Sequence, residues 1–293
     1  PESSVVLDDV ADVVLQRKDP PVDAEYVTAT QILSLCRRAL VLNRPEKLNA
    51  LTKPMWGRLG EVMRKLSADD TLRAIVIRGA GEKSFAPGND ISEFETERHN
   101  SVASAAYGKV HHEALAALAE CRHPMVALIR GICVGGGLEI AALCDLRICG
   151  VSSRFGIPIK NLGLTAGHGE IQALIDLAGR AVTRELLLEG RVFGAEEAFA
   201  KGLVNRVVPD DQVENEAYTT ARRMADGAPL AARWHKQFLR RLSDPRPLTD
   251  AERAEAYACY DTEDFRTGYR AFLAKQKPEF KGRIGLYGSS GAY

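Results

Sequence analysis

The sequence lacks a surplus of either charge, because 39 Lys and Arg residues stand against 39 Asp and Glu residues in a chain of 293. Proteins that bind nucleic acid through its phosphates usually carry a basic excess, and this composition excludes such an excess as a global property. Long apolar runs are also missing, and none approaches the roughly 18–20 residues that a transmembrane helix requires. We therefore expect no nucleic-acid partner and no membrane span.

Motifs for disulfides, metals and targeting are absent as well. The six cysteines show no CxxC spacing and lie mostly in apolar segments, which indicates buried free thiols in a reducing compartment. The acidic first residues, PESSVVLDDVADVV, have neither the basic start of a signal peptide nor the arginines of a transit peptide, so a cytoplasmic protein is expected. The neighbouring His111 and His112 are predicted to point to different faces of one helix, and no metal is expected.

The composition is that of a globular protein with a sizeable core, since 45% of the residues are hydrophobic and 27% are charged. Short apolar runs typical of buried strands alternate with amphipathic runs typical of helices. The strand-like runs are 39–43, 74–79, 125–131 and 146–150, and helix-like runs between them are 53–66 and 111–121. This alternation predicts an α/β fold with a parallel sheet and crossover helices.

The pattern changes after residue 211, because the strand-like runs stop and almost everything that follows is helical. We therefore divide the chain into an α/β core, residues 1–211, and a helical C-terminal region, residues 212–293. Two segments stand apart from this scheme. Residues 18–38 separate two strand-like runs by more than a turn requires, and the Gly/Ser-rich tail 284–293 is expected to fray.

Three consecutive glycines stand in VGGGLEIAALCD (134–145), where a strand-like run passes into a helix-like one. The first N–H groups of a helix have no intrahelical acceptor and lie at the positive end of the helix dipole. Because glycine has no Cβ, a ligand oxygen can approach such groups closely. A phosphate cradle and an oxyanion hole both fit, as does close strand–helix packing, whereas the absence of GxGxxG and GxxxxGK[ST] disfavours a nucleotide loop.

A second loop favours the oxyanion hole. In EKSFAPGNDISEF (82–94), the residues Pro87-Gly88-Asn89-Asp90 follow the strand-like run AIVIRG and precede a polar helix-like stretch. Two glycine-dependent loops at strand ends can each direct one N–H group at a single oxygen. Such a pair of donors holds an enolate without the help of a metal.

These segments resemble recurring blocks of the enoyl-CoA hydratase/isomerase (crotonase) superfamily, and the resemblance covers nearly the whole chain. A single block is weak evidence, whereas six blocks in the family's order are very specific. The blocks are LNRPEKLNAL (42–51), SFAPGNDISEF (84–94), RGICVGGGLEIAALCDLRI (130–148), FGIPIKNLGL (155–164), EGRVFGAEEAFAKGLVNRVVP (189–209) and FLAKQKPEFKGR (272–283).

The resemblance implies a spiral of ββα turns and a helical C-terminal region that assembles trimers or dimers of trimers. It implies an acyl-CoA thioester as the ligand, with coenzyme A present as part of the substrate and no separate cofactor. The oxyanion-hole donors would be the backbone N–H groups of Asn89 and Gly136. Asn89 and Gly136 also match CoA-binding positions of the family. The other matching positions are Lys47, Leu48, Ala86, Asp90 and Ile91.

Family hydratases typically use two glutamates, one that takes a proton from water and one that protonates the α-carbon. Glu139, in GGGLE, matches the first, although a carboxylate in the first turn of a helix is also favoured by the helix dipole alone. The second follows the proline of an FGxPE motif, and this chain has Ile159 there, in FGIPI. Because isoleucine cannot titrate, the standard two-glutamate arrangement is not expected.

Glu170, in LGLTAGHGEIQAL (162–174), is the candidate for the missing second group. The family usually has glycine at this position, and a carboxylate beside an acyl pocket can act as an acid or a base. His168 lies two residues earlier and belongs to the residue type that titrates near neutrality. The alternative is that Glu170 only caps or solvates the start of a helix over 170–179.

The sequence therefore predicts an acyl-CoA enzyme that stabilises an enolate, with enoyl-CoA hydration as the leading reaction. The same oxyanion hole could serve an isomerase, a thioester hydrolase or a decarboxylase. A weakly catalytic member that binds a CoA ligand or RNA is the alternative from another class, and the neutral net charge argues against RNA.

Overall fold

The computed structural model describes residues 3–7, 15–16 and 38–283 of the chain. The expectations for the segment 18–38, Arg38 apart, and for the tail 284–293 lie outside these residues, as does Cys36. Within the described part, Cys121, Cys133, Cys144 and Cys149 are buried free thiols and Cys259 is a partly exposed one, as the cysteine pattern predicted.

The larger sheet is built mainly from parallel strands. Its order is β11-β8-β6-β4-β3-β1-β2, and every neighbouring pair is parallel except β1 with β2. The four strands predicted from apolar runs are all present, and their ends agree with the prediction to within two residues. The strands are β1 (Ser3–Leu7), β2 (Leu15–Gln16), β3 (Arg38–Leu42), β4 (Ile75–Gly79), β6 (Met125–Ile129), β8 (Leu146–Gly150) and β11 (Arg206–Val208).

A second, smaller sheet contains β5 (Ser84–Ala86), β7 (Ile132–Val134), β9 (Arg154–Gly156) and β10 (Phe193–Gly194). The chain passes from the larger sheet to the smaller one and then into a helix, three times in succession. These turns are β4-β5-α4, β6-β7-α5 and β8-β9-α6, with α4 at Ser101–Ala119, α5 at Gly136–Leu143 and α6 at His168–Arg184. The predicted spiral of ββα turns is confirmed.

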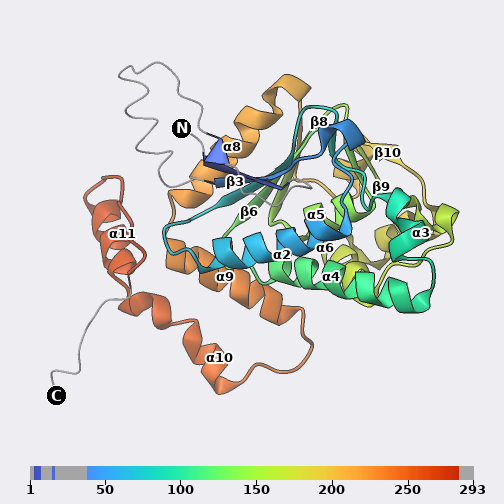
Figure 1. Cartoon of the computed structure of the whole chain (residues 1–293). Coiled ribbons are helices and arrows are strands. Elements are labelled where there is room, and N and C mark those ends of the chain that lie inside the picture. The colour runs from blue at the N-terminus through green and yellow to red at the C-terminus, as the bar shows by residue number, and fades with distance from the viewer. Residues whose placement is uncertain (1–2, 8–14, 17–37, 284–293) are drawn as a thin grey trace.

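Helices cover both faces of the larger sheet, which is why its interior strand β6 is buried throughout. The main core lies between the sheet and α2 (Lys53–Ala68) with α4, and it contains Trp56. The helix α2 begins where Thr52 accepts a hydrogen bond from the Met55 N–H, with Pro54 in its first turn. On the opposite face, α8 (Val213–Ala225) packs a stripe of small apolar residues on the sheet (Figure 1).

The remaining elements connect and extend this core. The predicted helix at 111–121 is the end of the longer α4, and α5 begins at Gly136, the middle glycine of the triplet. The helix predicted at 170–179 begins at His168 and continues to Arg184 across a kink at Gly179, whose φ is +77°. The other elements are η1 (Pro45–Lys47), η2 (Ile91–Glu93), α3 (Phe94–Glu97), η3 (Pro158–Leu162), η4 (Glu185–Glu189), α7 (Ala195–Ala200), η5 (Asp210–Gln212), α9 (Pro229–Leu242), α10 (Asp250–Glu255), η6 (Ala258–Asp261) and α11 (Glu263–Leu273).

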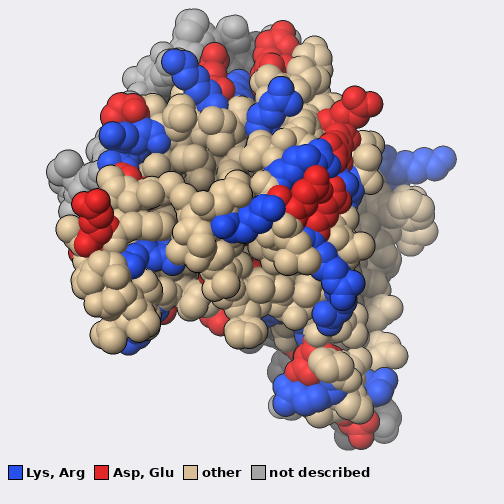
Figure 2. Space-filling model, turned by 90° about the vertical axis from the view of Figure 1, so that its right-hand side faces the viewer, with Lys and Arg blue, Asp and Glu red and all other residues tan. Residues whose placement is uncertain are grey.

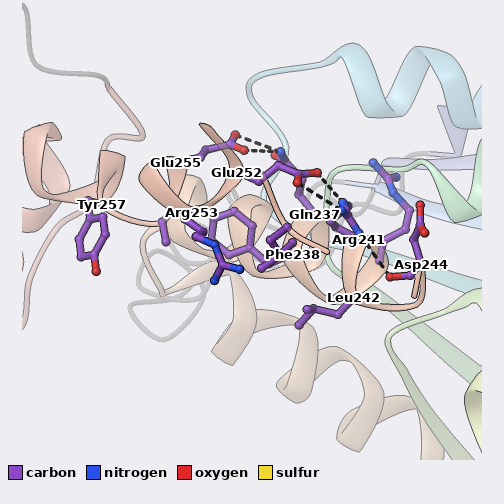
Figure 3. Close-up of a pocket in the computed structure, with 12 residues that line it drawn as sticks. Gln237, Phe238, Arg241, Leu242, Asp244, Glu252, Arg253, Glu255 and Tyr257 are labelled. Atoms are coloured by element: carbon purple, nitrogen blue, oxygen red, sulfur yellow. Dashed lines mark hydrogen bonds and ion pairs between the residues drawn. The ribbon is translucent and has the colours of Figure 1, made fainter. Parts of the chain in front are cut away.

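The last helices, α10 and α11, extend away from the α/β body as an arm (Figure 1). A cavity of about 700 Å³ lies between α9 and α10. Figure 3 shows that polar side chains in its wall are paired across the two helices: Arg241 forms an ion pair with Glu252, and Gln237 donates hydrogen bonds to Glu255. The arm leaves Phe272 and Leu273 exposed at 81% and 74%, so a large apolar surface is uncovered in the single chain.

Basic and acidic side chains are interspersed on the face drawn in Figure 2, and no continuous basic field covers that face. No helix in the described part of the chain has both the length and the apolarity needed to cross a bilayer.

The exposed apolar arm generates a prediction about assembly. We expect light scattering of the full chain to give the mass of three chains or a multiple of three, because association would bury that surface. Phe272→Asp should shift the protein toward the monomer. Val102→Asp, which alters a 78% exposed residue at the start of α4, should leave the mass unchanged. A monomeric wild-type protein would contradict the predicted trimer.

Candidate active site

The two glycine-containing loops predicted to form one site are in backbone contact. Gly88, after β5, has a φ of +103°, and a Cβ added there would lie 2.9 Å from the backbone nitrogen of Gly136. A Cβ on Gly137 would lie 2.1 Å from the carbonyl oxygen of Ala86. Gly135, which precedes α5, has a φ of +53°. The loops approach this closely only because these positions carry no side chain.

This contact brings together two N–H groups that have no acceptor among the described residues. The Leu51 N–H donates to the Gly88 carbonyl, and the Asp90 N–H donates to the Leu51 carbonyl, which fixes the backbone on both sides of Asn89. Within the described residues, the N–H groups of Asn89 and Gly136 donate to no protein atom. Gly136 is also the first residue of α5, where the helix dipole favours negative charge. The pair has the composition of an oxyanion hole.

Trp56 holds these loops in place from below. Its indole Nε1–H donates a 2.6 Å hydrogen bond to the side-chain oxygen of Asn89, and its ring leaves only 3.0 Å to a Cβ placed on Gly136. The hydroxyl of Tyr107 lies 3.4 Å from the same Asn89 oxygen and 3.4 Å from a Glu93 oxygen. Burial, and then the Glu93 charge, raise the pKa of Tyr107, so its hydroxyl remains a donor. Asn89 is therefore fixed by side chain as well as backbone.

Arg44 precedes the predicted CoA-binding residues Lys47 and Leu48 and forms an ion pair with Asp90. Its guanidinium lies 2.5 Å from an Asp90 oxygen, and the other Asp90 oxygen accepts hydrogen bonds from the N–H and hydroxyl of Ser92. Burial acts to raise the pKa of Asp90, but the hydrogen bonds from Ser92 and Arg44 outweigh it and lower the pKa to about 2. Asp90 is thus ionised, and each of its two oxygens has a partner in the protein.

The predicted CoA-binding residues surround this ion pair. Lys47 and Leu48 are exposed in the turn that follows Arg44, and Leu48 has a φ of +55°. Ile91 is also exposed, whereas Ala86 is fully buried with its carbonyl against Gly137. The structure therefore places Lys47 and Leu48 in the turn after Arg44, and Ala86, Asp90 and Ile91 next to Asn89 in or beside its loop.

Glu139 and Glu170 meet in the wall of one cavity of about 450 Å³. Both side chains are nearly buried, at 7% and 5% residue exposure. The side chain of Glu170 folds back over Gly167, the residue before α6, where a Cβ would lie 2.4 Å from Glu170 Oε2. The cavity is lined by His112, Leu115, Ala116, Ala119, Glu139, Leu143, His168, Gly169, Glu170 and Ala173. Glu170 and His168 thus both lie in the wall of this cavity.

Glu139 and Glu170 each carry an oxygen that makes no hydrogen bond within the described residues, Oε2 in both cases. Ile159 is not among the residues that line the cavity and instead packs against the main core. The cavity thus contains two carboxylates, although the usual second position holds a hydrocarbon side chain.

His111 is buried and the side chain of His112 is 57% exposed, as expected for different faces of α4, but both histidines contact the carboxylate of Glu170. His111 Nε2 lies 3.2 Å from Glu139 Oε2, and His111 Nδ1 lies 3.5 Å from Glu170 Oε1. His112 Nε2 lies 3.1 Å from the same Glu170 oxygen. The first turn of α6 lies over α4 so that one carboxylate contacts two consecutive histidines. Sequence reasoning missed this because nothing in the chain indicates how α4 and α6 meet.

In the described part of the chain, the group that could hold a metal ion consists of His111, His112 and Glu170. One ligand atom from each of His111, His112 and Glu170 falls within a 4.8 Å span. These atoms are already in contact with one another as acid and base, and both nitrogens of His111 face carboxylate oxygens. The contacts alone therefore account for the arrangement.

Comparison with known proteins identifies the family. The family model of enoyl-CoA hydratase/isomerase matches residues 38–283. The chain belongs to the enoyl-CoA hydratase/isomerase family. A second model, for the N-terminal domain of prokaryotic glutathione synthetase, matches only residues 2–49, most of which lie outside the described residues.

Individual relatives cover most of the chain. A short-chain-enoyl-CoA hydratase from Clostridium acetobutylicum is 34% identical, over 83% of this chain and 94% of its own length. A crotonyl-CoA hydratase from Syntrophomonas wolfei is 32% identical, over 82% and 93%. The crystal structure of an enoyl-CoA hydratase/carnithine racemase from Magnetospirillum magneticum is 47% identical, with a TM-score of 0.82 over 84% of this chain and 92% of that one. The crotonase fold predicted from the sequence is confirmed.

The Gly88 contact generates a prediction with a matched control. Gly88→Ala should push the added methyl against the Gly136 nitrogen and lower turnover of a CoA thioester such as crotonyl-CoA by about 10²–10³, the loss typical of one oxyanion-hole donor. Gly81→Ala also places a side chain at positive φ, in open space, and should cost only roughly 1–2 kcal/mol of stability. Steady-state kinetics and thermal melts separate the two effects. Equal activity in both variants would argue against the site.

Proposed function

We propose that this protein hydrates an enoyl-CoA thioester, adding water across the double bond conjugated to the thioester carbonyl. The observation that carries the proposal is the pair of buried carboxylates, Glu139 and Glu170, each with an oxygen free of hydrogen bonds in one cavity. Addition of water needs one group to accept a proton and another to donate one. Two converging carboxylates can supply both functions.

In the proposed reaction, the thioester oxygen accepts hydrogen bonds from the N–H groups of Asn89 and Gly136. The oxygen of a water molecule bonds to the β-carbon while one carboxylate takes a proton from that water. The electron pair of the double bond moves toward the thioester oxygen and forms an enolate, which the two donors stabilise. The enolate then reforms the carbonyl as the other carboxyl group gives a proton to the α-carbon.

The coenzyme A portion would lie along the loops that flank Asn89. Lys47 and Leu48 are proposed to line the adenine and pantetheine path, and Ala86, Asp90 and Ile91 to flank the thioester. Because Asp90 is paired with Arg44, it is proposed to hold the loops in position and not to donate or accept protons during the reaction. No separate cofactor is proposed, and a homotrimer or a dimer of trimers remains the proposed assembly.

The main alternative is a double-bond isomerase, a hydrolase or a decarboxylase that uses the same oxyanion hole. Hydratases and isomerases of the family both usually depend on the glutamate that Ile159 replaces, so this position does not separate the two reactions. Relatives that are named as hydratases support the hydration proposal. An RNA-binding role lacks support, since the chain has no net charge and the face in Figure 2 has no continuous basic field. Mass spectrometry of products from a panel of acyl-CoA thioesters separates the reactions.

Substitution of the two carboxylates tests their roles. Glu139→Gln and Glu170→Gln should each lower kcat by about 10²–10⁴, the usual contribution of general acid–base catalysis. The double variant should be little slower than either single one, because groups that act as a unit are strongly non-additive. Glu113→Gln, an exposed acidic residue on α4, is the matched control. Full activity of Glu170→Gln would leave Glu139 as the lone acid–base residue.

A further inference from the structure

We propose that His111 carries a proton between Glu139 and Glu170 and so restores their protonation states after each turnover. The proposal rests on the proposed function, because it assumes that both carboxylates take part in the reaction. His111 is not among the residues that line the cavity. It is therefore inferred to act through the carboxylates and not on the substrate.

The position of His111 is fixed from several sides. Its side chain is 9% exposed, and its ring meets the edge of Trp56 with 4.2 Å between ring centroids. Nε2 faces Glu139 at 3.2 Å and Nδ1 faces Glu170 at 3.5 Å, so each carboxylate has its own nitrogen. The Nε2 contact is off the line of a hydrogen bond, as is common for catalytic contacts before the substrate binds.

The chemistry of imidazole limits how protons can be distributed over these three groups. A neutral imidazole has one N–H donor and one nitrogen lone pair, and a lone pair repels a carboxylate oxygen. Two arrangements avoid this repulsion: an imidazolium between two carboxylates, or a neutral imidazole with one carboxyl group protonated. Both hold the same number of protons and the same net charge of one negative unit. They differ only in where one proton lies, and the ring can pass it from one side to the other.

The proposed reaction requires such a transfer. After one turnover, the group that took a proton from water is a carboxylic acid, and the group that protonated the α-carbon is a carboxylate. For the next turnover, one proton must return. The carboxylic acid gives its proton to the nearer nitrogen of His111, and the opposite nitrogen gives its proton to the other carboxylate. No proton or electron is gained or lost, and both groups regain their starting states.

His112 is a poor candidate for the same role. Its side chain is 57% exposed and contacts only Glu170, so it cannot connect the two carboxylates. It can orient Glu170 through the 3.1 Å hydrogen bond. The neighbouring histidines thus provide a matched pair for experiment, one between the carboxylates and one beside them.

The kinetic test follows crotonyl-CoA hydration by rapid mixing in the full-length protein. Wild-type product formation should be linear from the first turnover. His111→Gln can hydrogen-bond but cannot exchange a proton, so it should form one product per site and then slow by about 10²-fold or more, within the usual range for proton-transfer groups. Added imidazole buffer should speed the slow phase. His112→Gln should show no such burst, whatever its rate.

His111→Phe keeps the ring against Trp56 and should reproduce the burst if the polar substitution disturbs folding. A reduced rate without a burst, or a burst that imidazole does not shorten, overturns the relay and leaves His111 a structural role. Activation of the wild type by added Zn²⁺, lost in His112→Gln, also overturns it and favours a metal site.

A second measurement separates the relay from the proposed function. In ¹⁵N-histidine NMR of the full chain, Glu139→Gln and Glu170→Gln should each change the chemical shifts of both His111 nitrogens. The reason is that His111 and the two carboxylates share one proton. Shifts confined to the nearer nitrogen overturn the relay. If the wild type fails to hydrate crotonyl-CoA while both nitrogens respond, the hydration proposal fails and the shared proton stands.

Discussion

The site depends on a backbone contact that leaves no room for side chains. Gly88 and Gly136 come from loops that follow different strands of the smaller sheet, and the space between them would not hold a Cβ at Gly88. The register of β5 with β7 sets this approach, and Gly137 tightens it by packing against the Ala86 carbonyl. The three consecutive glycines, 135–137, are therefore ordered by their surroundings, and the conformational entropy that they lose is offset by the packing around them.

Trp56 connects this contact to the rest of the site. The indole is fully buried, bonds to the Asn89 side chain, borders Gly136 and supports the ring of His111. One side chain of α2 thus touches both loops and the histidine between the carboxylates. Because this buried indole N–H donates to a loop residue, the packing of the core fixes the position of that loop. The relative placement of the oxyanion-hole donors and the acid–base groups follows from that packing.

The sequence predicted the elements and the contact between loops better than it predicted the acid–base cluster. Strand positions follow from short apolar runs, and the role of the glycines follows from where they stand between strand and helix. Glu170 could be singled out because it departs from the family pattern at a position beside the cavity. His111 could not, since its significance depends on how α4 and α6 meet. Helix periodicity correctly separates neighbouring side chains by direction, but a carboxylate on another helix can reach both.

Two buried carboxylates in one cavity need an explanation, because removal of a charge from water costs several kcal/mol unless it is compensated. Part of the compensation is local, since Glu139 lies in the first turn of α5 and Glu170 in the first turn of α6. Both charges therefore lie at the positive ends of helix dipoles. The dipoles act on each carboxylate separately, however, and leave the repulsion between the two. A proton shared between them removes that repulsion, and His111 is the side chain that contacts both carboxylates. With a carboxylate at residue 170 and isoleucine at residue 159, a histidine of α4 thus lies in contact with both glutamates of the proposed acid–base pair.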